Sequence, residues 1–130
     1  ILSGKKLFIS SGYNKGCALL DLSSAEPKEV WRSRVMKNQL NSSVLIDGHL
    51  YGSDGDADKS ASLKCIDFAT GTEKWSDASV GFCSLVAADG KLIIMTAKGD
   101  EADKVQGFRL GADDYVVKPV AVLEFLARRP

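Results

Sequence analysis

The chain has 130 residues, of which 45% are hydrophobic and 26% charged, and this length and composition are typical of one soluble globular domain. Lysine plus arginine and aspartate plus glutamate both number 17, so the net charge is zero and argues against a nucleic-acid or anionic-membrane binder. A neutral protein also repels its own copies only weakly, which favours self-association or binding to another protein. The longest apolar run, Leu92–Met95, is too short to span a membrane.

A repeat of about 43 residues runs through the first three quarters of the chain. Short apolar runs follow Gly4, Gly48 and Gly90, and Trp31 and Trp75 lie 44 residues apart. Repeats of this length indicate stacked supersecondary units. No helical periodicity extends through Ile1–Ala97, so we expect only antiparallel strands and turns there.

Two dipeptides predict tight hairpin turns. Asp47-Gly48 and Asp89-Gly90 stand between apolar runs, and Asp-Gly pairs suit turns in which both residues have a positive φ. The cysteines Cys17, Cys65 and Cys83 lie inside apolar runs without metal-ligand spacing. We therefore expect them to be small buried hydrophobic residues rather than a disulfide or a metal site.

Residues 67–75 read DFATGTEKW. Four strands in 40–45 residues with a tryptophan near the end are typical of a β-propeller blade. The segment resembles the D-x-x-T-G-x-x-x-W motif of pyrroloquinoline-quinone-like propeller repeats. The resemblance implies that Asp67 and Thr70 hold a turn by hydrogen bonds, that Gly71 allows it, and that Trp75 packs between blades. Trp31 ends a weaker copy of the motif.

The resemblance to the propeller family covers residues 1–97, which we expect to form a partial propeller of about two blades. One blade is complete, Asn41–Val80. An incomplete blade precedes it, Leu7–Ser33, without its innermost strand, and the first two strands of a third follow, Phe82–Ala97. An open stack leaves faces and edges uncovered. We expect a second copy, another protein or the tail of the chain to cover them.

The pattern changes in the tail, residues 98–130. It predicts helices over Asp100–Leu110 and Val120–Arg129, with a strand at Tyr115–Val117 between them. The order strand, helix, strand, helix favours an α/β arrangement with parallel strands. We expect this α-β-α tail to pack on the same core as the blades and to share the strand Lys91–Thr96 with them.

Residues 91–129 closely resemble the last strand–helix–strand–helix section of response-regulator receiver domains. The stretch GADDYVVKP, Gly111–Pro119, is specific to that family. The resemblance implies that Thr96 is the hydroxyl that senses a phosphoryl group, that Lys118 supplies a cation to it, and that Tyr115 lies near the switch aromatic.

Other parts of a phosphotransfer site are missing from the sequence. A receiver needs an acidic pair for Mg²⁺ and an acceptor aspartate about 30 residues before the hydroxyl. Asp67 lies 29 residues before Thr96 but belongs to the blade motif. The acidic group Asp54, Asp56 and Asp58 is best interpreted as a solvated hairpin tip. We therefore expect no catalytic residue, no metal and no cofactor, and we do not expect an enzyme.

Three hypotheses follow from the sequence. The first is a non-catalytic propeller-type binding or scaffold module with a receiver-like tail. The second is a phosphoacceptor receiver of the kind found in two-component signalling. The third is a chimera, recombined or engineered, in which the two families are joined near Lys91–Glu101; it is compatible with the first.

Overall fold

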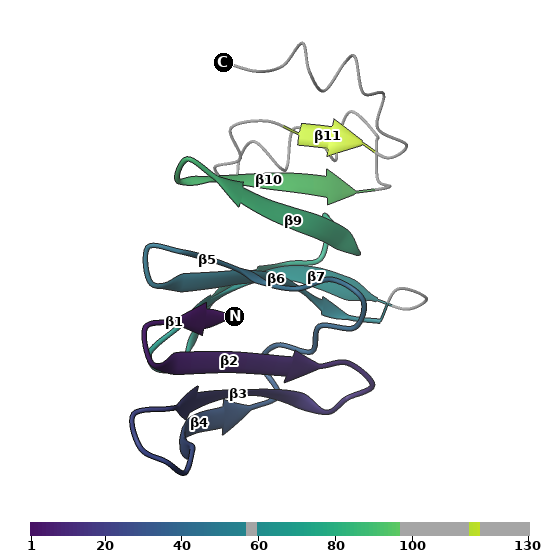
Figure 1. Cartoon of the computed structure of the whole chain (residues 1–130). Coiled ribbons are helices and arrows are strands. Elements are labelled where there is room, and N and C mark those ends of the chain that lie inside the picture. The colour runs from purple at the N-terminus through teal and green to yellow at the C-terminus, as the bar shows by residue number, and fades with distance from the viewer. Residues whose placement is uncertain (57–59, 97–114, 118–130) are drawn as a thin grey trace.

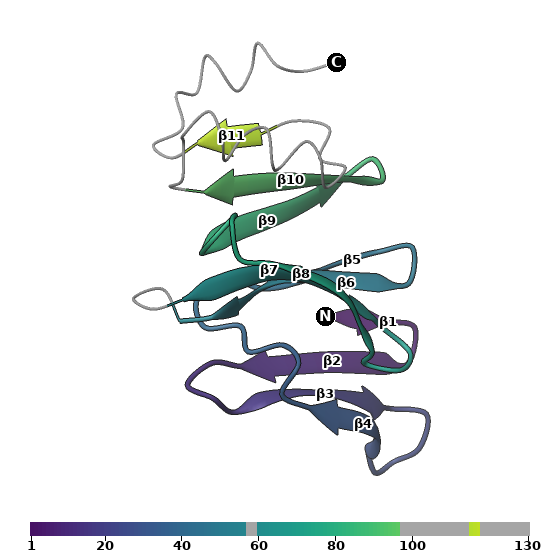
Figure 2. The same ribbon diagram turned by 180° about the vertical axis from the view of Figure 1, so that it is seen from behind.

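The computed structural model describes residues 1–56, 60–96 and 115–117 (Figure 1). These residues form a mainly β structure of three sheets that follow one another along the chain, and no helix occurs in these ranges. Figures 1 and 2 show the sheets stacked in chain order, with the first sheet at the lower end and no other element below it. Within the described part, no segment qualifies as a membrane-spanning helix.

The first sheet has four antiparallel strands in the order β1-β2-β3-β4. Their bounds are β1 Leu2–Ser3, β2 Lys6–Ser11, β3 Gly16–Asp21 and β4 Lys28–Ser33. The prediction that the first repeat lacks its innermost strand is therefore wrong. Strand β1 has only two residues, Leu2 and Ser3, which pair with Leu7 and Lys6, and so short a strand leaves no alternating pattern to detect.

The second sheet repeats this arrangement in the order β5-β6-β7-β8. Its strands are β5 Val44–Ile46, β6 His49–Gly55, β7 Ala61–Asp67 and β8 Glu73–Asp77. Both four-stranded sheets have a register shift next to the partner of a tryptophan: Leu19 pairs with Trp31, Cys65 pairs with Trp75, and the shift follows at once. The repeat seen in the sequence is thus a structural repeat, including its irregularities.

The third sheet is different. Strands β9 Cys83–Ala88 and β10 Lys91–Thr96 are antiparallel, but β10 also pairs in parallel with β11 Tyr115–Val117. The predicted strand at Tyr115–Val117 is confirmed, as is the prediction that Lys91–Thr96 pairs with both parts of the chain. The helices predicted over 100–110 and 120–129 lie outside the described residues.

The two Asp-Gly turns have the predicted geometry. Asp47 and Gly48 have φ values of 47° and 75°, and Asp89 and Gly90 have values of 52° and 71°. Positive φ at both central residues matches the right-handed twist of the strands on either side, so the turn closes a two-residue hairpin without splaying them.

The core lies between the sheets, because side chains alternate between the two faces of each strand. One buried cluster joins the first sheet to the second: Phe8, Cys17, Leu19, Met36, Leu50 and Ile66. A smaller one joins the second to the third: Leu63, Val80, Cys83 and Ile94. The prediction for the cysteines is confirmed, since Cys17, Cys65 and Cys83 are all buried and no disulfide joins them.

Candidate functional site

A tryptophan of the first sheet is inserted against a turn of the second. Trp31, on β4, donates a hydrogen bond from Nε1 to the carbonyl oxygen of Phe68 at 3.0 Å. A Cβ atom at Gly71 would lie 2.8 Å from Cδ2 and Cε3 of the Trp31 ring, and Gly71 has a φ of +73°. Both the close approach and the backbone angle require glycine at this position. The indole therefore fits the turn between β7 and β8 by shape and by a directed hydrogen bond.

The turn is held in shape by its own hydrogen bonds. The Oδ1 atom of Asp67 accepts bonds from the Thr70 backbone N–H at 2.9 Å and from the Thr70 hydroxyl at 3.0 Å. The Gly71 N–H donates to the Asp67 carbonyl at 2.9 Å, and the Asp67 N–H donates to the Thr72 carbonyl at 2.8 Å. These bonds, the Thr70 N–H first and its hydroxyl second, lower the pKa of Asp67 because they stabilise the carboxylate.

Trp75 lies at the other interface. Its ring is 6.0 Å from that of Tyr51, just as the Trp31 ring is 6.0 Å from that of Phe8. Trp75 packs against the cluster between the second and third sheets rather than against the 67–71 turn. The structure thus brings Asp67, Thr70 and Gly71 together with Trp31, and leaves Trp75 at the opposite face of the same sheet.

The segment that connects the first two sheets, residues 34–43, contacts all three sheets. The Asn38 N–H donates to Ser10 Oγ of the first sheet at 3.0 Å, and Asn38 Nδ2 donates to the Ser53 carbonyl of the second at 3.1 Å. Asn41 Nδ2 donates to the Cys83 carbonyl of the third at 2.7 Å. Sequence analysis did not single out these asparagines, because an isolated Asn in a loop carries no signal of what it will contact.

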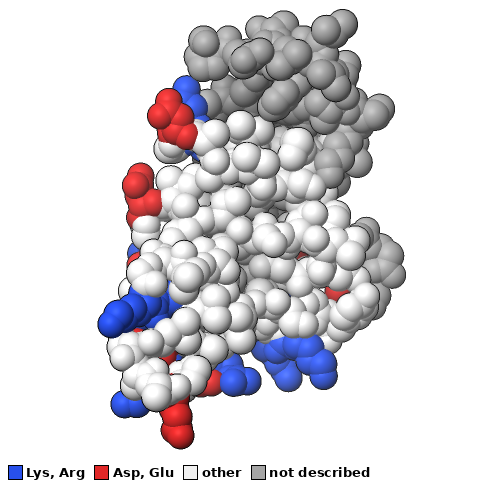
Figure 3. All heavy atoms as spheres, in the orientation of Figure 1, with Lys and Arg blue, Asp and Glu red and all other residues white. Residues whose placement is uncertain are grey.

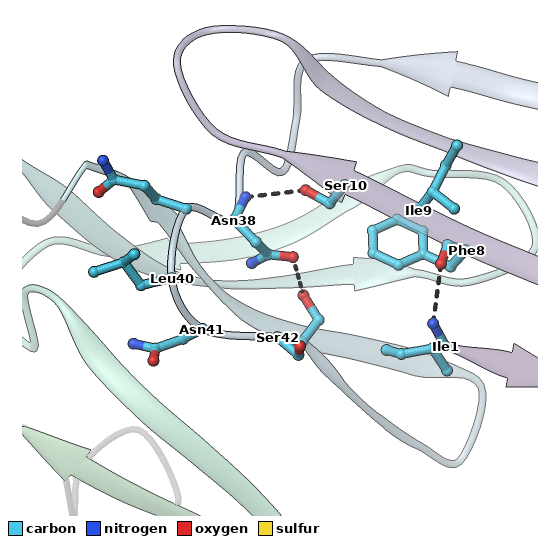
Figure 4. Close-up of a pocket in the computed structure, with 10 residues that line it drawn as sticks. Ile1, Phe8, Ile9, Ser10, Asn38, Leu40, Asn41 and Ser42 are labelled. Atoms are coloured by element: carbon cyan, nitrogen blue, oxygen red, sulfur yellow. Dashed lines mark hydrogen bonds between the residues drawn. The ribbon is translucent and has the colours of Figure 1, made fainter.

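This connecting segment lines a cavity of about 320 Å³ together with β2 (Figure 4). The Ser10 hydroxyl faces the backbone nitrogen of Asn38, whereas the side-chain oxygen of Asn38 accepts a hydrogen bond from Ser43 Oγ. The lining residues are Ile1, Phe8, Ile9, Ser10, Asn38, Gln39, Leu40, Asn41, Ser42 and Ser43. All of these side chains are uncharged, so the cavity offers hydrogen bonds and apolar contact but no side chain suited to acid–base chemistry.

A buried ionic network closes the edge of the same interface. Asp54 is only 8% exposed, and its carboxylate lies 3.0 Å from Lys37 Nζ and 3.0 Å from Lys64 Nζ. Lys64 Nζ also lies 3.1 Å from the Glu73 carboxylate. Burial alone would lower the pKa of Lys64, but its hydrogen bonds to Asp54 and Glu73 outweigh burial and leave that pKa raised.

The prediction of a solvated hairpin tip is therefore wrong for Asp54. Asp54 lies on β6, and its Oδ1 also accepts the Lys37 backbone N–H at 2.7 Å. Its lysine partners lie in the connecting segment, Lys37, and on the neighbouring strand β7, Lys64. Asp56 follows the end of strand β6, and Asp58 lies outside the described residues.

Two of the receiver-like positions, Thr96 and Tyr115, belong to the described residues. Thr96 is buried, and its Oγ1 donates to the Val80 carbonyl at 3.0 Å. Ser10 and Ser53 precede it at intervals of 43 residues, and Ser10 Oγ makes the corresponding bond to the Met36 carbonyl at 3.1 Å. Thr96 thus lies one repeat length after Ser53 and two repeat lengths after Ser10. The Tyr115 backbone pairs with Ile94, and Lys118 lies outside the described residues.

The charges of the described part are dispersed. Figure 3 shows a largely uncharged face, with lysine, arginine, aspartate and glutamate of both signs along one edge over the hairpin turns and at the lower end. Within the described ranges, no group of three or more histidine, cysteine, aspartate or glutamate residues could hold a metal ion.

A segment of the chain is similar to response-regulator transcription factors. The phosphate regulon regulatory protein PhoB of Pseudomonas aeruginosa is 46% identical over 43 residues, 33% of this chain and 19% of that protein. Over 37 residues, 28% of this chain, the regulatory protein ResD of Bacillus subtilis is 54% identical and the response regulator ArlR of Staphylococcus aureus 60% identical.

The match is local in both directions. The chain spans 15% of the length of ResD and 17% of that of ArlR. No family model matches the chain. No solved structure matches it either. The similarity therefore concerns a segment of about 40 residues, and the stacked sheets are known from the structure alone.

Proposed function

We propose that residues 1–97 are part of a β-propeller of the pyrroloquinoline-quinone-like kind and act as a non-catalytic binding or scaffold module. The observation that carries this proposal is the Trp31 indole, hydrogen-bonded to Phe68 and packed on Gly71 in the turn that begins at Asp67. The resemblance implies a tryptophan that packs between neighbouring blades, and Trp31 lies between the first and second sheets. Two successive four-stranded meanders with the same bulge add to the support.

Several carboxylates of this part are engaged in structural contacts within or between the sheets, which supports a non-catalytic role. Asp67 binds its own turn, Asp54 pairs with two lysines, and Asp21 pairs with Lys6. The cavity beside the connecting segment is lined by uncharged side chains, which suits a neutral polar ligand or a peptide. In this proposal the sheets provide a rigid surface rather than a reaction centre.

The similarity to response regulators favours a second candidate, a phosphoacceptor signalling domain. It would accept a phosphoryl group on an aspartate near Thr96 and Lys118. The parallel pairing of β10 with β11 is compatible with it. The buried Thr96 hydroxyl, engaged with the Val80 carbonyl, favours the scaffold instead. The propeller-like and receiver-like parts meet at β10, which is antiparallel to β9 and parallel to β11. We propose that a chimeric chain would be joined at this strand.

Phosphorylation separates the two candidates. The purified chain is incubated with acetyl phosphate and Mg²⁺ and its intact mass is measured, with an active receiver domain as the positive control. The scaffold proposal predicts no added phosphoryl group. A gain of one phosphoryl group that disappears in Asp67→Asn would overturn it in favour of the receiver.

A further inference from the structure

Three aspartates of the chain are each followed directly by a glycine: Asp47, Asp54 and Asp89. In such a pair the backbone nitrogen of the glycine can attack Cγ of the aspartate, since glycine has no side chain to obstruct the approach. The new N–C bond closes a five-membered succinimide, and the N–H proton leaves with the carboxyl hydroxyl as water. Water then opens the ring, and opening at the main-chain carbonyl carbon gives isoaspartate, whose backbone runs through Cβ.

The buried ionic network protects the pair Asp54-Gly55. The Asp54 carboxylate is bound to Lys37 Nζ and Lys64 Nζ, both at 3.0 Å, and accepts the Lys37 backbone N–H. The attacking group is held as well, because the Gly55 N–H donates to the Lys37 carbonyl at 3.2 Å. Ring closure requires these contacts to break, which slows the reaction about a hundredfold or more.

The pair Asp47-Gly48 is exposed but tied to its surroundings. The Gly48 carbonyl accepts the Phe68 N–H at 2.9 Å, so the turn is attached to the end of β7. The Asp47 carbonyl oxygen lies 3.0 Å from His49 Nδ1. That carbonyl belongs to the same peptide unit as the Gly48 nitrogen, so the second contact restrains the rotation that would bring this nitrogen to Cγ.

The pair Asp89-Gly90 is exposed and has the fewest restraints. Among the residues that the structure describes, nothing lies within 4 Å of a Cβ placed at Gly90. Within the same ranges, no hydrogen bond holds the Asp89 carboxylate or the Gly90 N–H. The turn depends on the hairpin alone, in which Ala88 pairs with Lys91. The carboxyl group and the nitrogen are therefore free to approach each other.

We propose that Asp89 is a site of spontaneous isomerisation to isoaspartate in the folded protein, with water as the only co-reactant. Asp47 reacts more slowly, and Asp54 is protected. Neither candidate function is needed for this reaction, so the modification is independent of both.

Isomerisation changes the hairpin that Asp89 closes. Isoaspartate adds one atom to the backbone between β9 and β10, whereas the two-residue turn requires a positive φ at both of its central residues. The pairing of Ala88 with Lys91 therefore loses its turn geometry. Strand β10 also pairs with β11, so the change loosens the strand that joins the two parts of the chain.

Site-resolved mass spectrometry of the aged wild-type protein tests the ranking. The folded chain is kept at neutral pH and digested, and electron-transfer fragmentation distinguishes isoaspartate from aspartate, which have the same mass. Isoaspartate is expected to form about tenfold faster at Asp89 than at Asp47, because two contacts restrain the Asp47 turn. In the chain unfolded by urea, the rates at Asp47, Asp54 and Asp89 should converge. Lys64→Ala is expected to accelerate the reaction at Asp54 and to leave the rate at Asp89 unchanged.

Hydrogen exchange tests the effect on the hairpin. Aging is expected to raise amide exchange over residues 83–96 and to leave it unchanged over residues 44–55. Asp89→Glu is the control, because it keeps the charge but can close only a six-membered ring, which forms far more slowly; its exchange should not change with age. Equal rates at Asp54 and Asp89 in the folded protein would overturn the proposal. An intact Asp89 after the unfolded chain has converted would overturn it too.

Discussion

The two interfaces between the sheets use equivalent tryptophans in different ways. At the first, Trp31 is hydrogen-bonded to Phe68 and packed on Gly71. At the second, Trp75 packs against aliphatic side chains and, among the residues that the structure describes, makes no hydrogen bond through Nε1. Each ring keeps an aromatic neighbour at 6.0 Å, Phe8 or Tyr51, so the local environment within each sheet is the same.

The difference arises from the next sheet along the chain. In the second sheet, β7 runs antiparallel to β6 and ends in the Asp67 turn that receives Trp31. In the third sheet, β10 takes the place of β6 and its neighbour β11 takes the place of β7. Strand β11 is parallel to β10, whereas β7 is antiparallel to β6. A repeat position thus determines where a tryptophan points, and the following unit determines what it binds.

Removal of the charge at the edge of the first interface has the largest expected effect. Asp54→Ala leaves Lys37 and Lys64 without their shared buried partner, so we expect a loss of about 3 kcal/mol in the free energy of unfolding. Urea unfolding followed by circular dichroism measures it. Glu26→Gln, at an exposed turn position, is the control and should stay within about 0.5 kcal/mol of wild type. A loss no larger than the control's would contradict the buried network.

The hydrogen bonds of the two tryptophans can be compared directly. Trp31→Phe keeps an aromatic ring but leaves the Phe68 carbonyl without its donor, so we expect a loss of about 1 kcal/mol beyond that of Trp75→Phe. Urea unfolding of the two variants gives the difference. Equal losses would show that the interfaces are alike and that the Phe68 bond contributes nothing.

A smaller effect on stability is expected at acidic pH. The Thr70 bonds lower the folded-state pKa of Asp67, so their contribution is complete above the unfolded-state pKa of about 3.9 and is lost as the pH falls through the folded-state value. Below about pH 4, wild type should lose stability that Asp67→Asn does not lose. Lys6 also lowers the pKa of Asp21. Because Asp21 is present in both proteins, its contribution to the pH dependence of stability is the same in both.

Urea titrations at several pH values between 7 and 3 measure this difference. Thr70→Val removes the hydroxyl but keeps the backbone N–H that is the main cause of the shift, so it should reduce the acid effect only in part. Identical acid profiles for wild type and Asp67→Asn would contradict the assignment.

The features that the sequence predicts best are local. Asp47-Gly48 and Asp89-Gly90 specify their turns through backbone angles that few residues adopt, and the strand at Tyr115–Val117 follows from a short apolar run between polar neighbours. Buried cysteines follow from their apolar surroundings. Each of these signals depends on residues within a few positions of the feature itself.

Contacts between distant residues escaped prediction. Asp54 is interpreted from the sequence as part of an acidic tip because its partners lie on other elements, Lys37 in the connecting segment and Lys64 on β7. Asn38 joins two sheets from a loop that has no periodicity. Trp31 belongs to the weaker motif, yet it is the tryptophan that fits the Asp67 turn, because the contact pairs one repeat with the next.

A double-mutant cycle between Trp31 and Gly71 tests the central claim most directly. Gly71→Ala introduces a Cβ 2.8 Å from the Trp31 ring at a φ of +73°, whereas Gly48→Ala, at a φ of +75°, meets nothing within 4 Å. The stacked-sheet account predicts that Trp31→Ala reduces the cost of Gly71→Ala to about that of Gly48→Ala, with a coupling of about 1 kcal/mol in the free energy of unfolding. Additive losses in the double variant would contradict it.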